Sequence, residues 1–188
     1  MSAVQGRWSV RSLALLATIC YLGAAFTKLW GMVLTSTFYY QGLHLNVFAN
    51  EVTGDLHELN ILNHYIGMLT IGDNMPEFHY IRWVLILLAL TSIAVALWPR
   101  RRVAGLLTGL EAAVLVLLGA DFYWRLYEYG HVFDLSAPMK VQPFTPQIWG
   151  NYQLANFHVV TAPGLGSFLL VMAFFLMLLV LVSLPKES

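Results

Sequence analysis

Residues 80–124 read YIRWVLILLALTSIAVALWPRRRVAGLLTGLEAAVLVLLGADFYW, two long apolar runs separated by one proline and three arginines. A membrane-spanning helix needs about 20 predominantly apolar residues, and both runs come close to that length. Proline cannot continue a helix in the ordinary way, and the charged segment Arg100 to Arg102 is short. We therefore expect an antiparallel pair of transmembrane helices over about 80–98 and 103–124.

Two further apolar runs, about 12–36 and 163–184, flank this pair. The chain is 59% hydrophobic and only 11% charged, whereas soluble proteins carry about 25% charged residues. These patterns predict an all-α membrane protein, a bundle of four transmembrane helices in a single membrane domain over 1–188. Two long polar segments, 37–79 and 125–162, connect the helices outside the membrane.

The first apolar run follows a short arginine-containing head, as in a signal peptide. The run continues well past Ala24 and Ala25, so we expect an uncleaved first helix. Basic residues flank one set of helix ends: Arg7, Arg11, Arg100, Arg101, Arg102 and Lys186. The positive-inside rule then predicts an inner-membrane protein of several spans with both termini in the cytoplasm. All six histidines fall in the outer segments: His44, His57, His64, His79, His131 and His158.

The outer segment 37–79 contains the polar run DLHELNILNHYIGM at residues 55–68. If this run is helical, His57, His64 and Met68 lie on roughly one face. Two imidazoles and a thioether suit copper better than magnesium or calcium, which prefer oxygen ligands. The alternative is structural: His64 and Asn63 bond to loop backbone, and Met68 packs in a core. Just before this run, residues 43–48 alternate loosely and could form a short strand.

The second outer segment offers a further imidazole. If the third helix continues outward past Asp121, His131 lies just beyond its end and could face the His64 loop. The predicted metal site then consists of His64, Met68 and His131, with His57 as a further candidate ligand. Residues expected to support these ligands are Asn63, Asp121 and Glu58. Alternatively, His131 only caps the end of its helix, where a cationic imidazole is favourable.

Two ionisable residues fall inside the expected spans, Glu111 in the third and Lys28 in the first. An unpaired charge in the bilayer is costly, so we expect either an ion pair between them or a neutral Glu111 bonded to Thr or Ser. The other possibility is a proton or cation relay. In the third run, Gly105 and Gly109 have the GxxxG spacing that allows close helix contact.

Several motifs resemble those of a known family. They are Gly54-Asp55, Glu58 and the string LNHYIGM at 62–68, followed by residues 121–127, Gly130-His131, Pro138, Phe144-Thr145-Pro146, Gly150, Asn156-Phe157 and Pro163-Gly164. Together they resemble a family of small membrane proteins found beside nitrous-oxide-reductase maturation genes. The resemblance spans nearly the whole chain and implies a role near copper delivery to an extracytoplasmic copper enzyme. His57 is not part of that pattern.

The chain has no nucleophile elbow, phosphate loop, dinucleotide fingerprint or HExxH motif, and its net charge of zero does not suggest nucleic acid. The single cysteine, Cys20, excludes an internal disulfide or a thiolate cluster. We expect a protein that binds or delivers copper on the extracytoplasmic face of the membrane and is not an enzyme. Its expected partners are the lipid bilayer and either an extracytoplasmic copper enzyme or a larger membrane complex. The alternative is a non-catalytic accessory subunit of a respiratory or oxygenase membrane complex. An enzyme with a catalytic metal is the third option.

Overall fold

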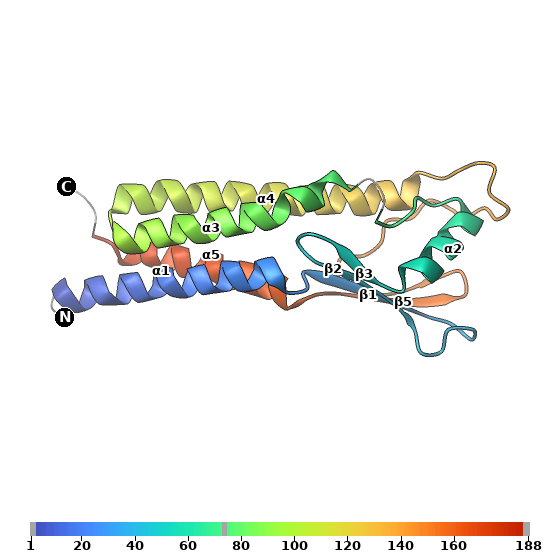
Figure 1. Cartoon of the computed structure of the whole chain (residues 1–188), viewed down its shortest axis with the longest axis horizontal. Coiled ribbons are helices and arrows are strands. Elements are labelled where there is room, and N and C mark those ends of the chain that lie inside the picture. Colours follow the sequence, from blue (N-terminus) through green and yellow to red (C-terminus); the bar gives the residue numbers. More distant parts are fainter. Residues whose placement is uncertain (1–2, 73–74, 186–188) are drawn as a thin grey trace.

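The computed structural model describes the backbone of residues 3–72 and 75–185, with side chains from Val10 onward. It is an elongated molecule in which helices occupy one half and a β-sheet the other (Figure 1). We call these the helical half and the sheet half. The helical half contains α1 (Ala3–Phe26), α3 (Ile81–Leu97), α4 (Arg101–His131) and α5 (Leu165–Ser183). The sheet half contains β1 (Trp30–Thr35), β2 (Leu43–Val47), β3 (Val52–Gly54), α2 (Leu56–Ile66), the 3-10 helix η1 (Pro76–His79), β4 (Gly150–Leu154) and β5 (Phe157–Pro163).

The sheet is antiparallel throughout, with the strand order β3-β2-β1-β5-β4. The central strand β1 follows α1 directly, and β5 leads directly into α5, so the sheet is attached to the helical half through its two middle strands. The backbone N–H of Gly164 donates to the carbonyl of Leu29 at 2.7 Å, and that of Gly166 to the carbonyl of Lys28 at 2.8 Å. The hydrogen bonding of the sheet therefore continues up to the first turn of α5.

One face of the sheet is apolar and packs beneath α2 and the outer end of α4. Its buried side chains form a core of their own: Trp30, Leu34, Leu43, Leu45, Leu59, Ile71, Leu126 and Val159. A second core lies between the long helices and is rich in alanine, which lets α1 approach α3 and α5 closely. The structure thus has two hydrophobic cores, one in each half.

The all-α fold class predicted above is wrong, because the chain contains this five-stranded sheet. The expected helix over 12–36 ends at Phe26, and its continuation is β1. A continuous apolar run does not reveal by its periodicity whether it is a helix or a buried strand. The short strand expected at 43–48 is confirmed as β2.

The expected number of four spans is also wrong. Among the described residues, only α4 and α5 are both long and apolar enough to cross a membrane. The apolar parts of α1 (Val10–Phe26) and α3 are shorter. The 17 residues of α3 extend about 26 Å at 1.5 Å per residue, less than the hydrocarbon thickness of about 30 Å. Helix α3 starts only at Ile81, because Pro76–His79 form η1 instead.

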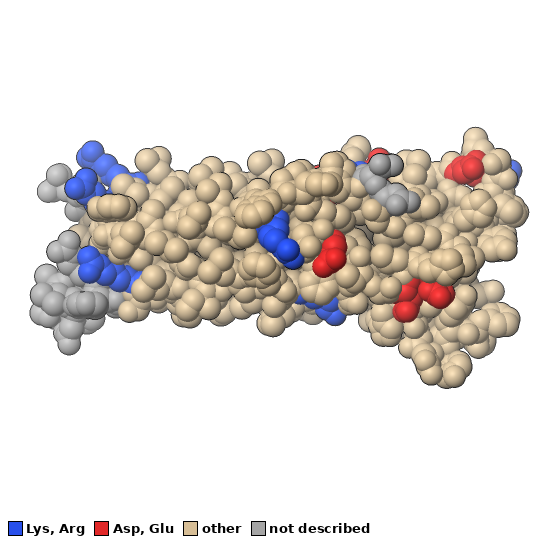
Figure 2. Space-filling view, viewed as in Figure 1, with Lys and Arg blue, Asp and Glu red and all other residues tan. Residues whose placement is uncertain are grey.

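Charges are segregated along the long axis (Figure 2). On the visible face, Lys and Arg gather at the far end of the helical half and are followed by a band without charged side chains. Beyond this band both signs appear, with Lys or Arg near the middle of the molecule and Asp and Glu over the sheet half. At the far end, Arg101 donates through Nη1 to the Leu181 carbonyl at 3.2 Å and also to the carbonyl of Leu184. A cation at the end of α5 compensates the unpaired carbonyls of that helix.

Candidate functional site

Helix α2 carries two of the four residues expected to bind metal, His57 and His64. The helix follows Asp55, whose carboxylate accepts a hydrogen bond from the backbone N–H of His44 at 2.7 Å. His57 is exposed in the first turn and borders an open surface pocket together with His79. His64 is exposed in the last turn. The half-buried Glu58 lies in the first turn, where the helix dipole stabilises a negative charge.

The asparagines of this run are structural. The Asn60 amide donates to the Ile71 carbonyl at 3.1 Å and accepts from the Ile71 backbone N–H at 2.7 Å. The Asn63 amide donates to the Leu69 carbonyl at 3.1 Å and to the Tyr129 hydroxyl at 3.2 Å. These bonds hold residues 69–71 against α2, and the Asn63 Nδ2 group is already used in hydrogen bonds to the Leu69 carbonyl and the Tyr129 hydroxyl.

The turn after α2 packs against the segment that follows α4. Met68 pairs with Phe133 in an isolated β-bridge, and the Asp134 backbone N–H donates to the Gly67 carbonyl at 2.7 Å. Gly67 has φ 74°, and a Cβ there would lie 2.6 Å from the Asp134 carbonyl oxygen, so only glycine fits the turn. Hydrogen bonds from Ser136 lower the pKa of the Asp134 carboxyl, and His64 adds to this effect. The structure therefore brings the His64 and His131 segments together.

His131 is the last residue of α4, and its ring stacks on Tyr127 with centroids 3.9 Å apart. Its Nδ1 lies 2.9 Å from the Tyr127 carbonyl. Since a carbonyl only accepts, Nδ1 carries the proton, which leaves Nε2 as the lone-pair nitrogen in the neutral ring. The described residues contain no group of three or more His, Cys, Asp or Glu side chains that could hold a metal ion.

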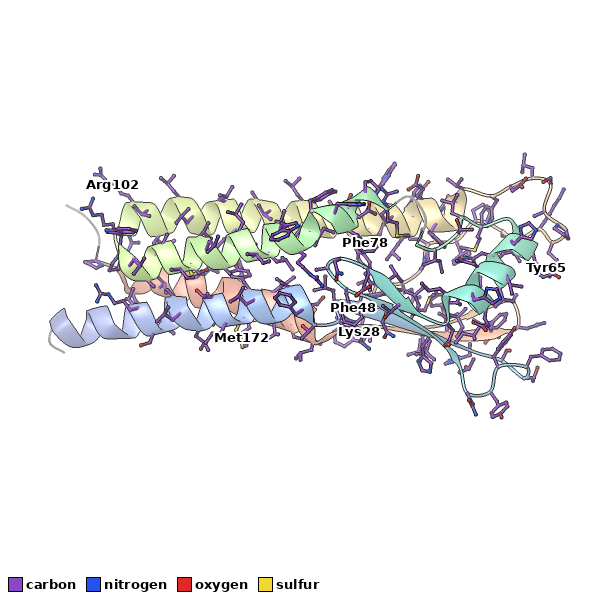
Figure 3. The ribbon with its side chains drawn as sticks, viewed as in Figure 1. Lys28, Phe48, Tyr65, Phe78, Arg102 and Met172 are labelled. Carbon is purple, nitrogen blue, oxygen red and sulfur yellow. The ribbon has the colours of Figure 1, made fainter. Side chains whose placement is uncertain are left out.

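The two residues expected inside the membrane lie apart. Glu111 is fully buried and accepts hydrogen bonds from Thr91 Oγ1 at 3.0 Å and Ser92 Oγ at 3.4 Å. Lys28 lies between α1 and β1, where its side chain is exposed (Figure 3). Of the two expected arrangements, the structure has the hydroxyl contacts from Thr91 and Ser92 in place of the ion pair, because α1 ends before it reaches Lys28.

A cavity of about 490 Å³ lies at the junction of the two halves. Its walls come from the apolar face of the sheet, from α3, α4 and α5, and from the loop before β4. Phe48 and Phe78, both in its wall, lie where the helices meet the sheet (Figure 3). Trp30 donates through Nε1 to the Ile148 carbonyl at 2.7 Å and meets Phe122 edge-on at 5.5 Å. The cavity is lined almost wholly by apolar side chains and is partly open.

Among the described residues, three charged side chains reach the wall of this cavity: Glu77, Asp121 and Arg125. Arg125 holds the buried Glu77 through two contacts, Nε to Oε1 at 2.7 Å and Nη2 to Oε2 at 2.9 Å. Its Nη1 also donates to Glu128 at 2.9 Å. This bidentate arrangement ties η1 to α4 and gives the apolar cavity a polar edge.

The sequence placed Asp121 on the third apolar helix, but it did not identify Glu77 or the cavity. Asp121 lines the cavity, whereas we expected it to support a metal ligand beside the α2 turn. The spacing of Asp121 and Arg125, four residues apart on one helix, is the signal that both could face one site. The partner Glu77 comes from 48 residues earlier in the chain.

Comparisons of the chain with models of known families, with curated proteins and with solved structures find no match.

Proposed function

We propose that this protein is a membrane-embedded binding protein that holds a lipid-like molecule in the cavity between its two halves. The main support for this proposal is the cavity at the junction of the two halves. Its volume of about 490 Å³ falls within the range of about 300–1,000 Å³ typical of ligand sites, which are mostly apolar with a few polar groups. Walls of leucine, valine and aromatic side chains favour a ligand with a long apolar part.

The proposed membrane placement supports this ligand class. Helices α4 and α5 would cross the membrane with α1 and α3 packed beside them. The 31 residues of α4 extend about 46 Å, so its last third projects beyond a hydrocarbon layer of about 30 Å. By the positive-inside rule, the arginine-rich end, where α1 begins and α5 ends, faces the cytoplasm of a cell with an inner membrane. The cavity then opens near the outer surface of the bilayer, within reach of membrane lipids.

Native mass spectrometry of the detergent-purified protein tests the proposal. We expect one tightly held lipid-like molecule per chain in the wild type. Leu118 lies in the cavity wall, whereas Leu110 is on the same helix and half-exposed outside it. Leu118→Trp should abolish the bound molecule by filling the cavity, and Leu110→Trp should keep it. A folded Leu118→Trp protein that retains the same ligand would contradict the proposal.

Copper binding on the outer face is a second candidate, in line with the family resemblance and its implied delivery of copper to an extracytoplasmic enzyme. The observation that favours it is the contact between the Met68 turn and the segment after His131. A histidine whose Nδ1 bonds to a carbonyl, as in His131, presents Nε2 in the orientation typical of metal ligands. His64, Met68 and His131 would supply nitrogen and sulfur ligands.

Metal analysis after dialysis against copper separates this candidate from its alternatives. The triple variant His64→Ala, Met68→Ala, His131→Ala should lose bound copper. The control is His44→Ala with His158→Ala, since both histidines are exposed on the outer face of the sheet. Equal copper in the triple variant and the wild type would exclude the site.

The role of accessory subunit in a larger membrane complex is compatible with either ligand. The loop tips of the sheet half expose three large side chains by more than 80% each, Phe38, Tyr40 and Leu135, and exposed apolar groups often mark contact surfaces. A photo-crosslinker at position 38 in native membranes should capture one defined partner chain. If no defined partner chain is captured, a stable complex through this surface is excluded.

A further inference from the structure

The polar groups of the junction cavity restrict what kind of lipid it accepts; this inference rests on the function proposed above. Most polar groups in the wall already have partners. Ser167 Oγ donates to the Leu29 carbonyl at 2.7 Å, and the Tyr129 hydroxyl donates to the Leu69 carbonyl. The guanidinium of Arg125 is shared between Glu77 and Glu128. In the part of the wall that the structure describes, no cation is therefore left to receive an anionic head group.

Asp121 is different. It lies one helical turn before Arg125 on α4 and in the cavity wall. Among the described residues it interacts electrostatically with Tyr80 but has no hydrogen-bond or ion-pair partner. Two carboxylates and one guanidinium give the wall one negative charge in excess. A phosphate or carboxylate would be repelled there, whereas a hydroxyl can donate a charge-assisted hydrogen bond to Asp121.

The side chains around Asp121 indicate the shape of the head group. Five aromatic residues line the same cavity: Trp30, Phe48, Phe78, Phe122 and Tyr129. Aromatic rings favour the faces and edges of another ring. Toward the middle of the helical half, the wall continues as aliphatic side chains: Leu85, Leu115, Leu118, Leu170 and Val171. The cavity thus has a part lined by aromatic side chains, a part lined by aliphatic side chains, and the Asp121 carboxylate as a hydrogen-bond acceptor.

We propose that the cavity binds a reduced quinol, a lipid with a hydroxylated aromatic head group and a long apolar tail. One quinol hydroxyl donates to Asp121, the ring lies among the aromatic side chains, and the tail extends along α4 and α5 toward the membrane interior. The oxidised quinone has carbonyl groups in place of hydroxyls, so it has no O–H group that can donate a hydrogen bond to Asp121. The cavity therefore discriminates between the two oxidation states by binding.

Calorimetric titration of the full-length protein in detergent under argon tests this inference with four decyl-chain probes: a quinol, its quinone, decanol and decanoic acid. We expect the quinol to bind about tenfold more tightly than the quinone, since one charge-assisted hydrogen bond corresponds to at least that factor. Decanol should bind less well than the quinol because it lacks the ring, and decanoic acid should bind least.

Asp121→Asn removes the charge while its amide can both donate and accept, so the quinol-to-quinone preference should fall to near one. Asp134→Asn is the matched control, because Asp134 is exposed and lies outside the cavity wall, and it should keep the tenfold preference. Equal binding of quinone, decanol or decanoic acid by the wild type would overturn the quinol assignment and leave a lipid site in place. Failure of all four probes to bind, together with no effect of Leu118→Trp on co-purified lipid, would overturn the proposed function itself.

Discussion

Gly130 is the position at which a single methyl group should do most damage to the sheet half. It lies on α4 beneath the loop that returns toward β4, and its carbonyl accepts a hydrogen bond from the Phe144 backbone N–H at 3.0 Å. A Cβ at Gly130 would lie 1.7 Å from the Phe144 carbonyl oxygen. The loop would have to retreat by roughly 1.5–2 Å to reach ordinary contact distance. Because Pro146 and Ile148 of this loop line the cavity, the retreat would also loosen one cavity wall.

The magnitude of Gly130→Ala follows from three contributions. Overpacking costs about 1–3 kcal/mol, and loss of the Phe144 hydrogen bond about 1 kcal/mol. Alanine returns about 1 kcal/mol through its higher helix propensity. We expect a net loss of about 2 kcal/mol, or a fall in Tm of about 4–8 °C for a chain of this size.

Thermal unfolding in detergent, followed by circular dichroism, measures the effect, and hydrogen exchange over residues 138–146 localises it. Gly119→Ala is the control on the same helix, because a Cβ at Gly119 meets no heavy atom within 4 Å. That variant should be neutral or slightly more stable. Equal Tm values for the two variants, with unchanged exchange over 138–146, would refute the placement of the loop on α4.

Three further predictions test local features of the sheet half. Ala155, in the β4–β5 turn, has φ 50°, which costs a non-glycine residue about 1–2 kcal/mol; Ala155→Gly should therefore raise Tm slightly, whereas a lower Tm would contradict the turn geometry. Asn60→Leu removes both side-chain bonds to the Ile71 backbone and should cost about 1–3 kcal/mol, with faster hydrogen exchange at residues 69–71; unchanged exchange there would count against those bonds. Ser136→Ala should raise the pKa of Asp134 toward its ordinary value, because it removes the hydroxyl that donates the side-chain hydrogen bond and keeps only the backbone N–H donor of residue 136. Since this carboxyl titrates lower in the folded than in the unfolded protein, its stabilising effect is present above about pH 4 and is lost as the pH falls. NMR titration of the Asp134 carboxyl carbon should show the rise in the variant, and an unchanged pKa would disprove the cause.

The sequence predicted some parts of this structure well for physical reasons. The apolar runs that became α4 and α5 are long enough to be recognised by length and composition. The alternation at 43–47 was sufficient for β2. The continuation of the third helix past Asp121 and the approach of its end to the His64 loop were also anticipated as a possibility, and α4 does extend to His131.

The strand β1 could not be identified from its own residues. It consists of Trp30 to Thr35, an apolar continuation of the run that forms α1, and it becomes a strand because β2 and β5 pair with both of its edges. The pairing with β5 depends on residues more than 100 positions away in the chain. The polar residues of α2 were expected to bind or support a metal ion. In the structure, the Asn60 and Asn63 side chains instead form hydrogen bonds with backbone groups of residues 69–71.

The candidate cavity was beyond sequence reasoning for the same reason. Glu77 and Arg125 lie on separate elements, and their contact is set by the packing of η1 against α4. Trp30, Phe48 and Phe122 come from three distant segments. Periodicity describes the faces of single elements, but a cavity forms where faces of several elements fail to meet.

The most direct test of the central claim is an experimental density map of the protein purified in mild detergent at a resolution that shows side chains. We predict elongated density between Trp30 of β1 and Leu170 of α5, and the polar end of the bound molecule should lie beside Asp121. A map in which the cavity is filled by protein side chains, or in which α4 packs directly on the sheet without space between them, would contradict it.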